Sequence, residues 1–296
     1  MPLLREEAEK LSNNQLVSGV IDEIIERDDL FSVLPFVGVN SKAYVYNREK
    51  TLGGAEFLDP NDPIKESGAT FEEVVAKLRI MAGDVDVDKF LQTTMGDTND
   101  QMAIQIAKKA KALARKFHQT LATGDTGTDP KAFDGLPKLV TADQTINANG
   151  ALTLNMLDEL LDAVPNGADA IVMRRGTIRA FRALLRATYG TDAVMQQLEN
   201  FGRPMLTHNG VPIIMNEFLS GTEGDAGAAG CSIYAVRLNE VDGLHGLYGG
   251  GNAGIVIENV GTVQDKDATR IRLKWYNGLA LKSTKSIARL KGITNV

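Results

Sequence analysis

Hydrophobic and polar positions change their spacing several times along the chain, and each change predicts an element. Near the start, Leu16, Val20 and Ile24 recur at helical spacing until Pro35 ends the pattern. The clearest helix is predicted over residues 97–122, where apolar side chains step by three or four. These side chains are Met102, Ile106, Ala110, Leu113, Phe117 and Leu121. Another face of the same helix carries Lys108, Lys111, Arg115 and His118, which we expect to be a cationic face.

Alternation of apolar and polar residues appears on both sides of a polar stretch early in the chain. It runs through residues 37–45 and returns over residues 74–87. Residues 47–69 between them are rich in glycine and proline and poor in apolar side chains, with Phe57 and Leu58 the main exceptions. The pattern predicts a long hairpin with a mobile tip near Lys50 and Lys65. Loops of this length inside compact domains are usually functional.

From residue 152 onward, short helices and strands alternate. Residues 154–164 and 177–188 read as helices, and residues 170–173 as a buried strand. Residues 204–218 read as a hairpin that turns at Asn209 and Gly210. The closing part, residues 255–260 and 269–276, is strongly strand-like. The chain therefore combines a helix-and-hairpin first half with a mixed α/β second half.

Composition and charge narrow the possible functions. The 296 residues carry 32 Lys plus Arg against 38 Asp plus Glu, a net charge of −6. This balance argues against a surface that grips nucleic acid throughout, because that requires clustered cations. The single cysteine, Cys231, excludes an intrachain disulfide and leaves no thiolate set for zinc. No apolar run is long enough to span a bilayer and the first residues do not resemble a signal peptide, so neither a membrane protein nor a secreted one is expected.

Two short motifs imitate ligand sites and fail on their context. Gly249, Gly251 and Gly254 match a dinucleotide-binding spacing, but a strand pattern follows where a helix is required. Asp84, Asp86 and Asp88 imitate the start of a calcium loop, yet lysine occupies its sixth position and methionine its twelfth. On a strand, these three carboxylates share one solvated face. We therefore assign no catalytic, cofactor-binding or metal-binding residue and expect no enzyme activity.

Two charged segments are candidate contact surfaces. Residues 1–30 hold eight acids, Asp22, Glu23 and Glu26 among them, against three bases. They form either a solvated helix on their own domain or an arm that packs on a neighbouring subunit. Arg179, Arg182 and Arg186 share one face of a predicted helix. They suit phosphate binding, or pairing with acids such as residues 22–29 of another subunit.

The order of these elements, together with two segments, resembles a known family. The first segment runs from Gly124 to Pro130 and continues as Phe133-Asp-Gly-Leu136; the second is the basic ending, residues 270–282 with 287–293. In this order the chain resembles the major capsid proteins of tailed bacteriophages (Caudoviricetes), whose shell fold is shared with encapsulins. The resemblance implies an α+β phage major-capsid fold with an N-terminal arm, an extended β-hairpin loop, a peripheral domain with a long spine helix and an α/β axial domain.

The resemblance also implies a domain layout. Residues 1–40 would be the N-terminal arm, and residues 41–92 the extended loop with its base strands. Residues 93–135 and 255–280 would form the peripheral domain, and residues 136–254 and 281–296 the axial domain. The resemblance and the charge pattern together suggest subunit-interface candidates: Phe57, Leu58, Lys50, Lys65, Asp22, Glu23, Glu26, Arg179, Arg182 and Arg186.

As a function, the resemblance implies a structural protein that self-assembles as hexamers and pentamers into an icosahedral shell. The shell would enclose phage double-stranded DNA without sequence-specific binding, form part of the virion and assemble in the host cytoplasm. Because the chain starts almost directly at the arm, a separate scaffolding protein is expected, with a portal and decoration proteins as further partners. No cofactor and no membrane partner are expected, and neither is covalent crosslinking through Lys50 or Lys65.

Two other functions stay open at this point. An encapsulin-like nanocompartment uses the same fold, and its N-terminal arm would become a helix that docks cargo. The alternation of residues 152–240 also allows an α/β enzyme whose site is not recognised. Neighbouring genes would separate the first from a phage capsid, and electron microscopy would separate the second.

Overall fold

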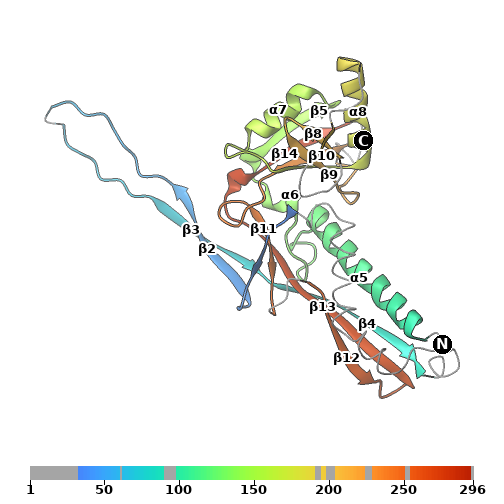
Figure 1. Cartoon of the computed structure of the whole chain (residues 1–296). Helices are drawn as coiled ribbons and strands as arrows, with labels where there is room; N and C mark the ends of the chain where they lie inside the picture. Colours follow the sequence, from blue (N-terminus) through green and yellow to red (C-terminus); the bar gives the residue numbers. More distant parts are fainter. Residues whose placement is uncertain are drawn as a thin grey trace.

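The computed structural model describes residues 33–60, 62–89, 98–190, 195–197, 204–223, 229–250 and 254–294. Asp22, Glu23, Glu26 and nearly all of the predicted arm lie outside these residues. Two sheets and a long helix make up the body, and a hairpin projects far from it (Figure 1). Within the described part of the chain, no helix is long and apolar enough to cross a membrane.

Strand β13 (Ala268–Leu281) organises the first sheet. One of its edges pairs over ten residues with β4 (Arg79–Asp88), in antiparallel register. Its other edge pairs with β12 (Val256–Thr262) and then with β11 (Leu244–Tyr248), which is parallel to β1 (Phe36–Gly38). Strand β11 falls inside the range 136–254 that the resemblance places in the axial domain, yet it pairs with β13.

Helix α5 (Thr98–Thr123) lies along this sheet and confirms the helix expected at residues 97–122 (Figure 1). Its predicted apolar stripe packs into the core: Ile106, Ala110, Leu113, Phe117 and Leu121 are buried against Val85, Leu273 and Trp275. The expectation for His118 is wrong. Its side chain is buried, with its ring edge-on to Phe117, because residue 118 directly follows a core position.

The second sheet has seven strands among the described residues, in the order β5-β14-β10-β6-β9-β8-β7. Their bounds are β5 (Thr145–Gly150), β6 (Ala170–Met173), β7 (Met195–Gln197), β8 (Pro204–His208), β9 (Val211–Met215), β10 (Cys231–Val236) and β14 (Ile287–Ile293). The predicted turn between β8 and β9 is confirmed: Asn209 and Gly210 have φ angles of 49° and 82°, as a two-residue hairpin with the right twist requires.

Alternate residues of the second sheet belong to two different cores. Val172 and Tyr234 face the core that contains α5 and the first sheet. Their neighbours Ile171 and Ile233 face a second core, which is closed by α7 (Leu154–Asp162) and α8 (Arg175–Tyr189). Because strand side chains alternate between faces, one sheet joins both cores into a single body.

The segment that follows α5 contains a close backbone contact. The amide of Gly135 donates to the carbonyl of Gly124 at 2.9 Å, and a β-carbon on Gly135 would lie 2.4 Å from the carbonyl oxygen of Thr120. Only glycine fits there. The contact brings Phe133 to 5.2 Å from the ring of Phe117 and leads into the short helix α6 (Leu136–Leu139). The first of the two segments that carry the family resemblance therefore closes the C-terminal end of the long helix.

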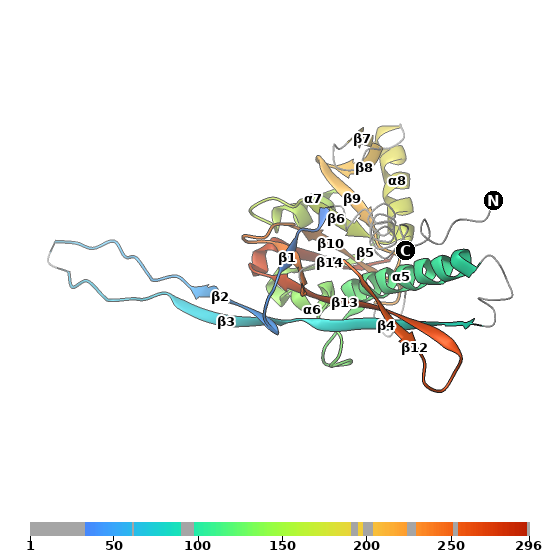
Figure 2. The same cartoon turned by 60° about the horizontal axis from the view of Figure 1, so that its bottom comes forward.

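The predicted hairpin is confirmed as β2 (Ala43–Thr51) and β3 (Thr70–Lys77), joined by residues 52–69. Figure 2 shows both strands leaving the body as one long arm. At Leu78 the chain passes from β3 into β4, so the alternation of residues 74–87 belongs to two strands with different partners. Among the described strands, β3 pairs only with β2, whereas β4 lies in the first sheet.

Candidate subunit-interface surfaces

The two faces of the hairpin differ sharply in their surroundings. Tyr44, Tyr46 and Ala76 point inward and pack against a small core of Val39, Leu247 and Ala280. The outward face carries the directly paired Val45 and Val75, both exposed. Phe71 lies further along the same face and is also exposed. An apolar surface of this kind on a projecting element is typical of a protein–protein contact.

The tip of the hairpin, residues 52–69, exposes more apolar side chains than the sequence pattern suggested. The exposed fractions are 108% for Phe57, 85% for Ile64 and 81% for Leu52, and Leu58 is exposed too. Phe57 and Leu58 are therefore accessible as expected, while the sequence analysis missed Leu52 and Ile64 because they stand singly among polar residues.

Both candidate lysines of the loop are exposed. Lys50 lies near the end of β2, and Lys65 lies on the tip, 3.6 Å from Glu56. The ion pair links the two sides of the tip near the exposed Phe57. Whether either lysine touches a neighbouring subunit stays a prediction.

Helix α8 presents an arginine stripe, which we define as Arg175, Arg179, Arg182 and Arg186. All four side chains are exposed, and their spacing of four, three and four residues places them on one helix face. The sequence analysis placed the last three on one helix face, and the structure adds Arg175 to that face, 3.7 Å from Glu217. Pairing of this stripe with Asp22, Glu23 or Glu26 stays a prediction, because those acids lie outside the described residues.

Opposite charges form a ladder across the outer face of the first sheet. Arg272 donates two hydrogen bonds to Asp84, at 2.8 and 2.9 Å, and Arg270 donates two to Asp86, at 2.7 and 2.8 Å. The antiparallel register of β4 and β13 places each acid directly opposite its arginine. The expected solvated face is confirmed for Asp84 and Asp86, and each carboxylate is paired with an arginine of the neighbouring strand.

These pairs shift the ionisation of the acids. Hydrogen bonds from Arg272 and Arg270 lower the pKa values of Asp84 and Asp86, respectively. A hydrogen bond from Lys274 likewise lowers the pKa of Glu258 on β12. Because all three carboxylates are solvated, their pairs contribute register and orientation more than stability.

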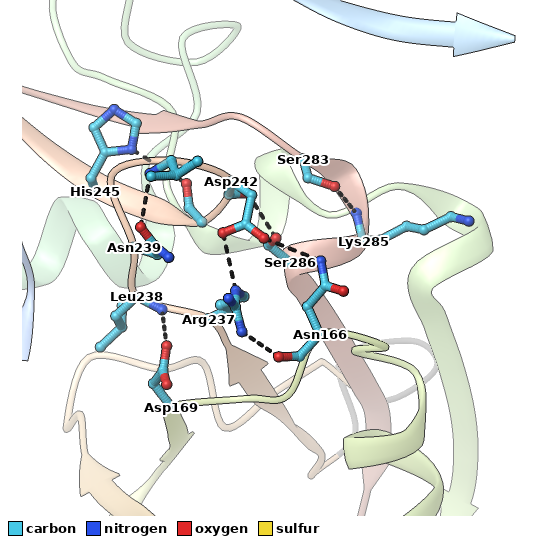
Figure 3. A network of polar contacts seen from close by, with 12 residues as sticks. Asn166, Asp169, Arg237, Leu238, Asn239, Asp242, His245, Ser283, Lys285 and Ser286 are labelled. Carbon is cyan, nitrogen blue, oxygen red and sulfur yellow. Dashed lines mark hydrogen bonds and ion pairs between the residues drawn. The ribbon is translucent and has the colours of Figure 1, made fainter. Parts of the chain in front are cut away.

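Two crossing segments, residues 237–243 and 282–286, connect the two sheets, and we call them together the joint. The first leads from β10 to β11 and the second from β13 to β14. Figure 3 shows Asp242 at its centre. Its carboxylate accepts hydrogen bonds from Arg237 at 3.0 Å and from Asn166 at 3.1 Å. Its backbone carbonyl accepts from the amide of Ser283 at 3.0 Å and the hydroxyl of Ser286 at 2.7 Å.

Further contacts tie the joint to both sheets. The amide of Leu238 donates to the Asp169 carboxylate at 2.8 Å, and the amide of Lys282 donates to the carbonyl of Gly243 at 3.3 Å (Figure 3 shows the first). His245 is fully buried beside the joint, and its Nδ1 lies 3.3 Å from the carbonyl of Gly243. Burial lowers the pKa of His245. The two crossings are therefore held as one unit by side-chain and backbone hydrogen bonds.

The single cysteine of the chain occupies a structural position in the core. Cys231 is buried, with its sulfur 2.9 Å from the Thr177 hydroxyl, and burial raises the pKa of its thiol, which disfavours the reactive thiolate. Among the described residues, no three His, Cys, Asp or Glu side chains come close enough to hold a metal ion. What the described residues offer instead is exposed apolar and charged surface, which is typical of a protein that associates with other protein chains.

Comparison with solved structures places the fold. The chain is similar over 100% of its length to 98% of the SrpI encapsulin of Synechococcus elongatus PCC 7942, with a TM-score of 0.71 and 20% identity. It is also similar to a subunit of Mycobacterium phage Bobi, with 98% of each chain covered, a TM-score of 0.61 and 15% identity. The capsid of a native GTA particle gives a TM-score of 0.63 at 16% identity and 89% coverage of both chains. At these identities the likeness establishes the shared capsid and encapsulin fold.

The sequence identifies the family within that fold. Residues 77–226, half of the chain, match the SU10 major capsid protein family, and the chain belongs to it. No curated protein matches the sequence. The protein is therefore a bacteriophage major capsid protein, a structural subunit that assembles with copies of itself into the shell of the virion. At 20% identity, the likeness to the encapsulin shows the fold alone.

Proposed function

We propose that the β2–β3 hairpin is the extended loop with which one shell subunit lies across its neighbour. The observation that carries this proposal is the tip, which stands away from its own body with Leu52, Phe57 and Ile64 exposed (Figure 2). A subunit that exposes such side chains on an arm needs a second surface to cover them.

The energetics of the tip support a contact with another copy. Ordering its backbone costs about 1–2 kcal/mol per residue, and the tip has almost no buried side chain to offset this cost. Burying Leu52, Phe57 or Ile64 on a neighbour returns about 1.5–3 kcal/mol for each side chain. The tip is therefore expected to be fixed only when it lies on a second subunit.

The geometry of this contact also favours ring formation. The hairpin of one copy would bind a different surface on the next copy, which is a heterologous contact. Contacts of this kind close into rings when the rotation between neighbours allows it. Rings of six and of five subunits are the hexamers and pentamers that we propose for the shell.

The remaining roles that we propose follow from charge and from the family. The shell would enclose double-stranded DNA without sequence-specific contacts, and the net charge of −6 supports weak rather than tight DNA contact. We propose assembly in the host cytoplasm with a separate scaffolding protein, a portal and decoration proteins. We also propose that the subunit has no enzyme activity and forms no lysine crosslink.

Replacing residues 49–68 by a short Gly-Ser turn tests the extended loop. The replacement leaves the buried residues of both cores in place, so we expect folded subunits that stay as monomers or small capsomers in electron micrographs. As a matched control, Glu66→Ser removes an exposed charged side chain of the tip but keeps the apolar ones and both candidate lysines, and it should assemble normally. Closed, stable shells from the loop replacement would refute the proposed function.

A further inference from the structure

The base of the hairpin is tied to the body by side chains of β2. Tyr46 donates its hydroxyl hydrogen to the carbonyl of Leu281 at 2.6 Å. Arg48 donates from Nη2 to the same carbonyl at 2.7 Å and from Nε to the carbonyl of Lys282 at 2.8 Å. One carbonyl oxygen has two lone pairs and can accept both of the first two bonds. Together these three hydrogen bonds are termed the latch.

The latch lies at the outer end of the apolar root of the hairpin. The root consists of Tyr44, Tyr46 and Ala76, which pack on the body. Arg48 lies two residues further toward the tip. Its planar fork holds two successive carbonyls at once, so it restrains direction as well as distance. Arg48 is thus the side chain that fixes the hairpin where it leaves the body.

The carbonyls that accept these bonds belong to a firmly held segment. Leu281 ends β13, where it pairs with Leu244, and the next residues cross to the second sheet. Lys282 and Ser283 are hydrogen-bonded through their amides to Gly243 and Asp242 of the joint. The latch therefore connects the hairpin to the joint of Figure 3 rather than to a loose loop.

We propose that Arg48 and Tyr46 set the angle at which the hairpin leaves the body, and that Arg48 is a positioning residue for the contact with a neighbouring subunit. The inference rests on the proposed role of the hairpin. Arg48 lies five residues from the start of β2, and the tip lies about fifteen residues from it. If the hairpin swings about the start of β2, its constant rise per residue makes a displacement at Arg48 grow about threefold at the tip. A small freedom at the base would therefore misplace Phe57 on its target.

The test measures the hairpin direction in unassembled subunits. Nitroxide labels on Lys65→Cys and Lys285→Cys, both exposed positions, report the distance between tip and body, while the native Cys231 is buried. We expect a narrow distance distribution in the parent. Arg48→Lys keeps the charge but loses the fork, and Tyr46→Phe keeps the ring but loses the hydroxyl. Each should broaden the distribution by about twofold or more, because the tip amplifies motion at the base.

A matched control and a second readout separate positioning from stability. Lys77→Gln removes an exposed cation at the hairpin base that is not part of the latch, and it should leave the distribution unchanged. Shell yield, measured by sedimentation, should fall for Arg48→Lys while the thermal midpoint of the free subunit stays near that of the parent.

Several results would overturn the inference. If Arg48→Lys and Tyr46→Phe leave the distance distribution unchanged, the latch does not set the hairpin direction, even if the thermal midpoint of the subunit falls. A broadened distribution with parental shell yield and diameter would show that the angle has no role in assembly. The proposed function fails separately: closed shells from the loop replacement would refute it, whereas the distance distribution is measured without assembly.

Discussion

Truncating Phe117 to alanine tests the packing of the long helix against the first sheet. The Phe117 side chain is fully buried. The centroid of its ring lies 4.9 Å from that of Trp275, 5.2 Å from that of Phe133 and 6.3 Å from that of Phe36. One ring thus joins α5, β13, the segment after α5 and β1. Removing it leaves a cavity at a place where four elements meet.

The size of the effect follows from these contacts. A buried Phe-to-Ala change costs about 3–5 kcal/mol, and each aromatic pair contributes about 0.5–1.5 kcal/mol beyond its buried area. With three such pairs lost, we expect about 4–5 kcal/mol. Natural domains are stable by only about 5–15 kcal/mol, so the variant should lose a large part of its stability. For a chain of 296 residues, the melting temperature should fall by about 6–8 °C.

Urea unfolding measures this loss directly. The chain has one tryptophan, Trp275, and its fluorescence reports on the core around Phe117. Phe117→Leu should lose less stability, and Gln119→Ala, at an exposed position of the same helix, should lose very little. A Phe117→Ala protein that unfolds at the same urea concentration as Gln119→Ala would refute the core assignment.

Two further predictions concern pH. Asp86→Asn breaks the ion pair with Arg270. Because Arg270 lowers the pKa of Asp86, this pair stabilises the folded protein at pH values above the unfolded pKa of about 4. The stabilisation is lost as the pH falls further and Asp86 is protonated. In urea unfolding, the variant should be slightly less stable than the parent at pH 7 in low salt. The difference should shrink as pH falls below about 4 or in 1 M salt, and an equal difference at all pH values would contradict this. Burial lowers the pKa of His245, so the unfolded chain binds the proton more readily and stability falls as pH drops below about 6.5. His245→Asn should weaken the loss of stability between pH 7 and pH 5, and a parental slope would contradict the assignment.

The local pattern of the sequence was sufficient to predict the elements whose defining contacts recur along their own length. The stripe from Ile106 to Leu121 has the period of a helix, and the structure forms α5 there. The alternating segments around a polar stretch became β2 and β3, and the Asn209-Gly210 pair became a tight turn. In each case the signal lies within a few residues, so spacing and turn chemistry are visible in the sequence.

Contacts between distant segments were decided only by the tertiary structure. Asp84 and Asp86 of β4 carried no sign of their partners, because Arg270 and Arg272 lie more than 180 residues away. Their pairing depends on the register of β4 against β13. His118 illustrates the same limit. Its helix was predicted from the sequence, but the neighbours that cover its side of the helix were not.

The candidate interface divides in the same way. The sequence alone identified the polar loop with Phe57 and the arginines of α8, because composition and helical spacing show them. The latch of Arg48 and the joint around Asp242 arise where the chain passes twice between the two sheets, and residues more than 230 positions apart meet there. The acceptors of the latch are backbone carbonyls, which every residue carries, so only the folded arrangement of the chain determines which carbonyl each side chain finds.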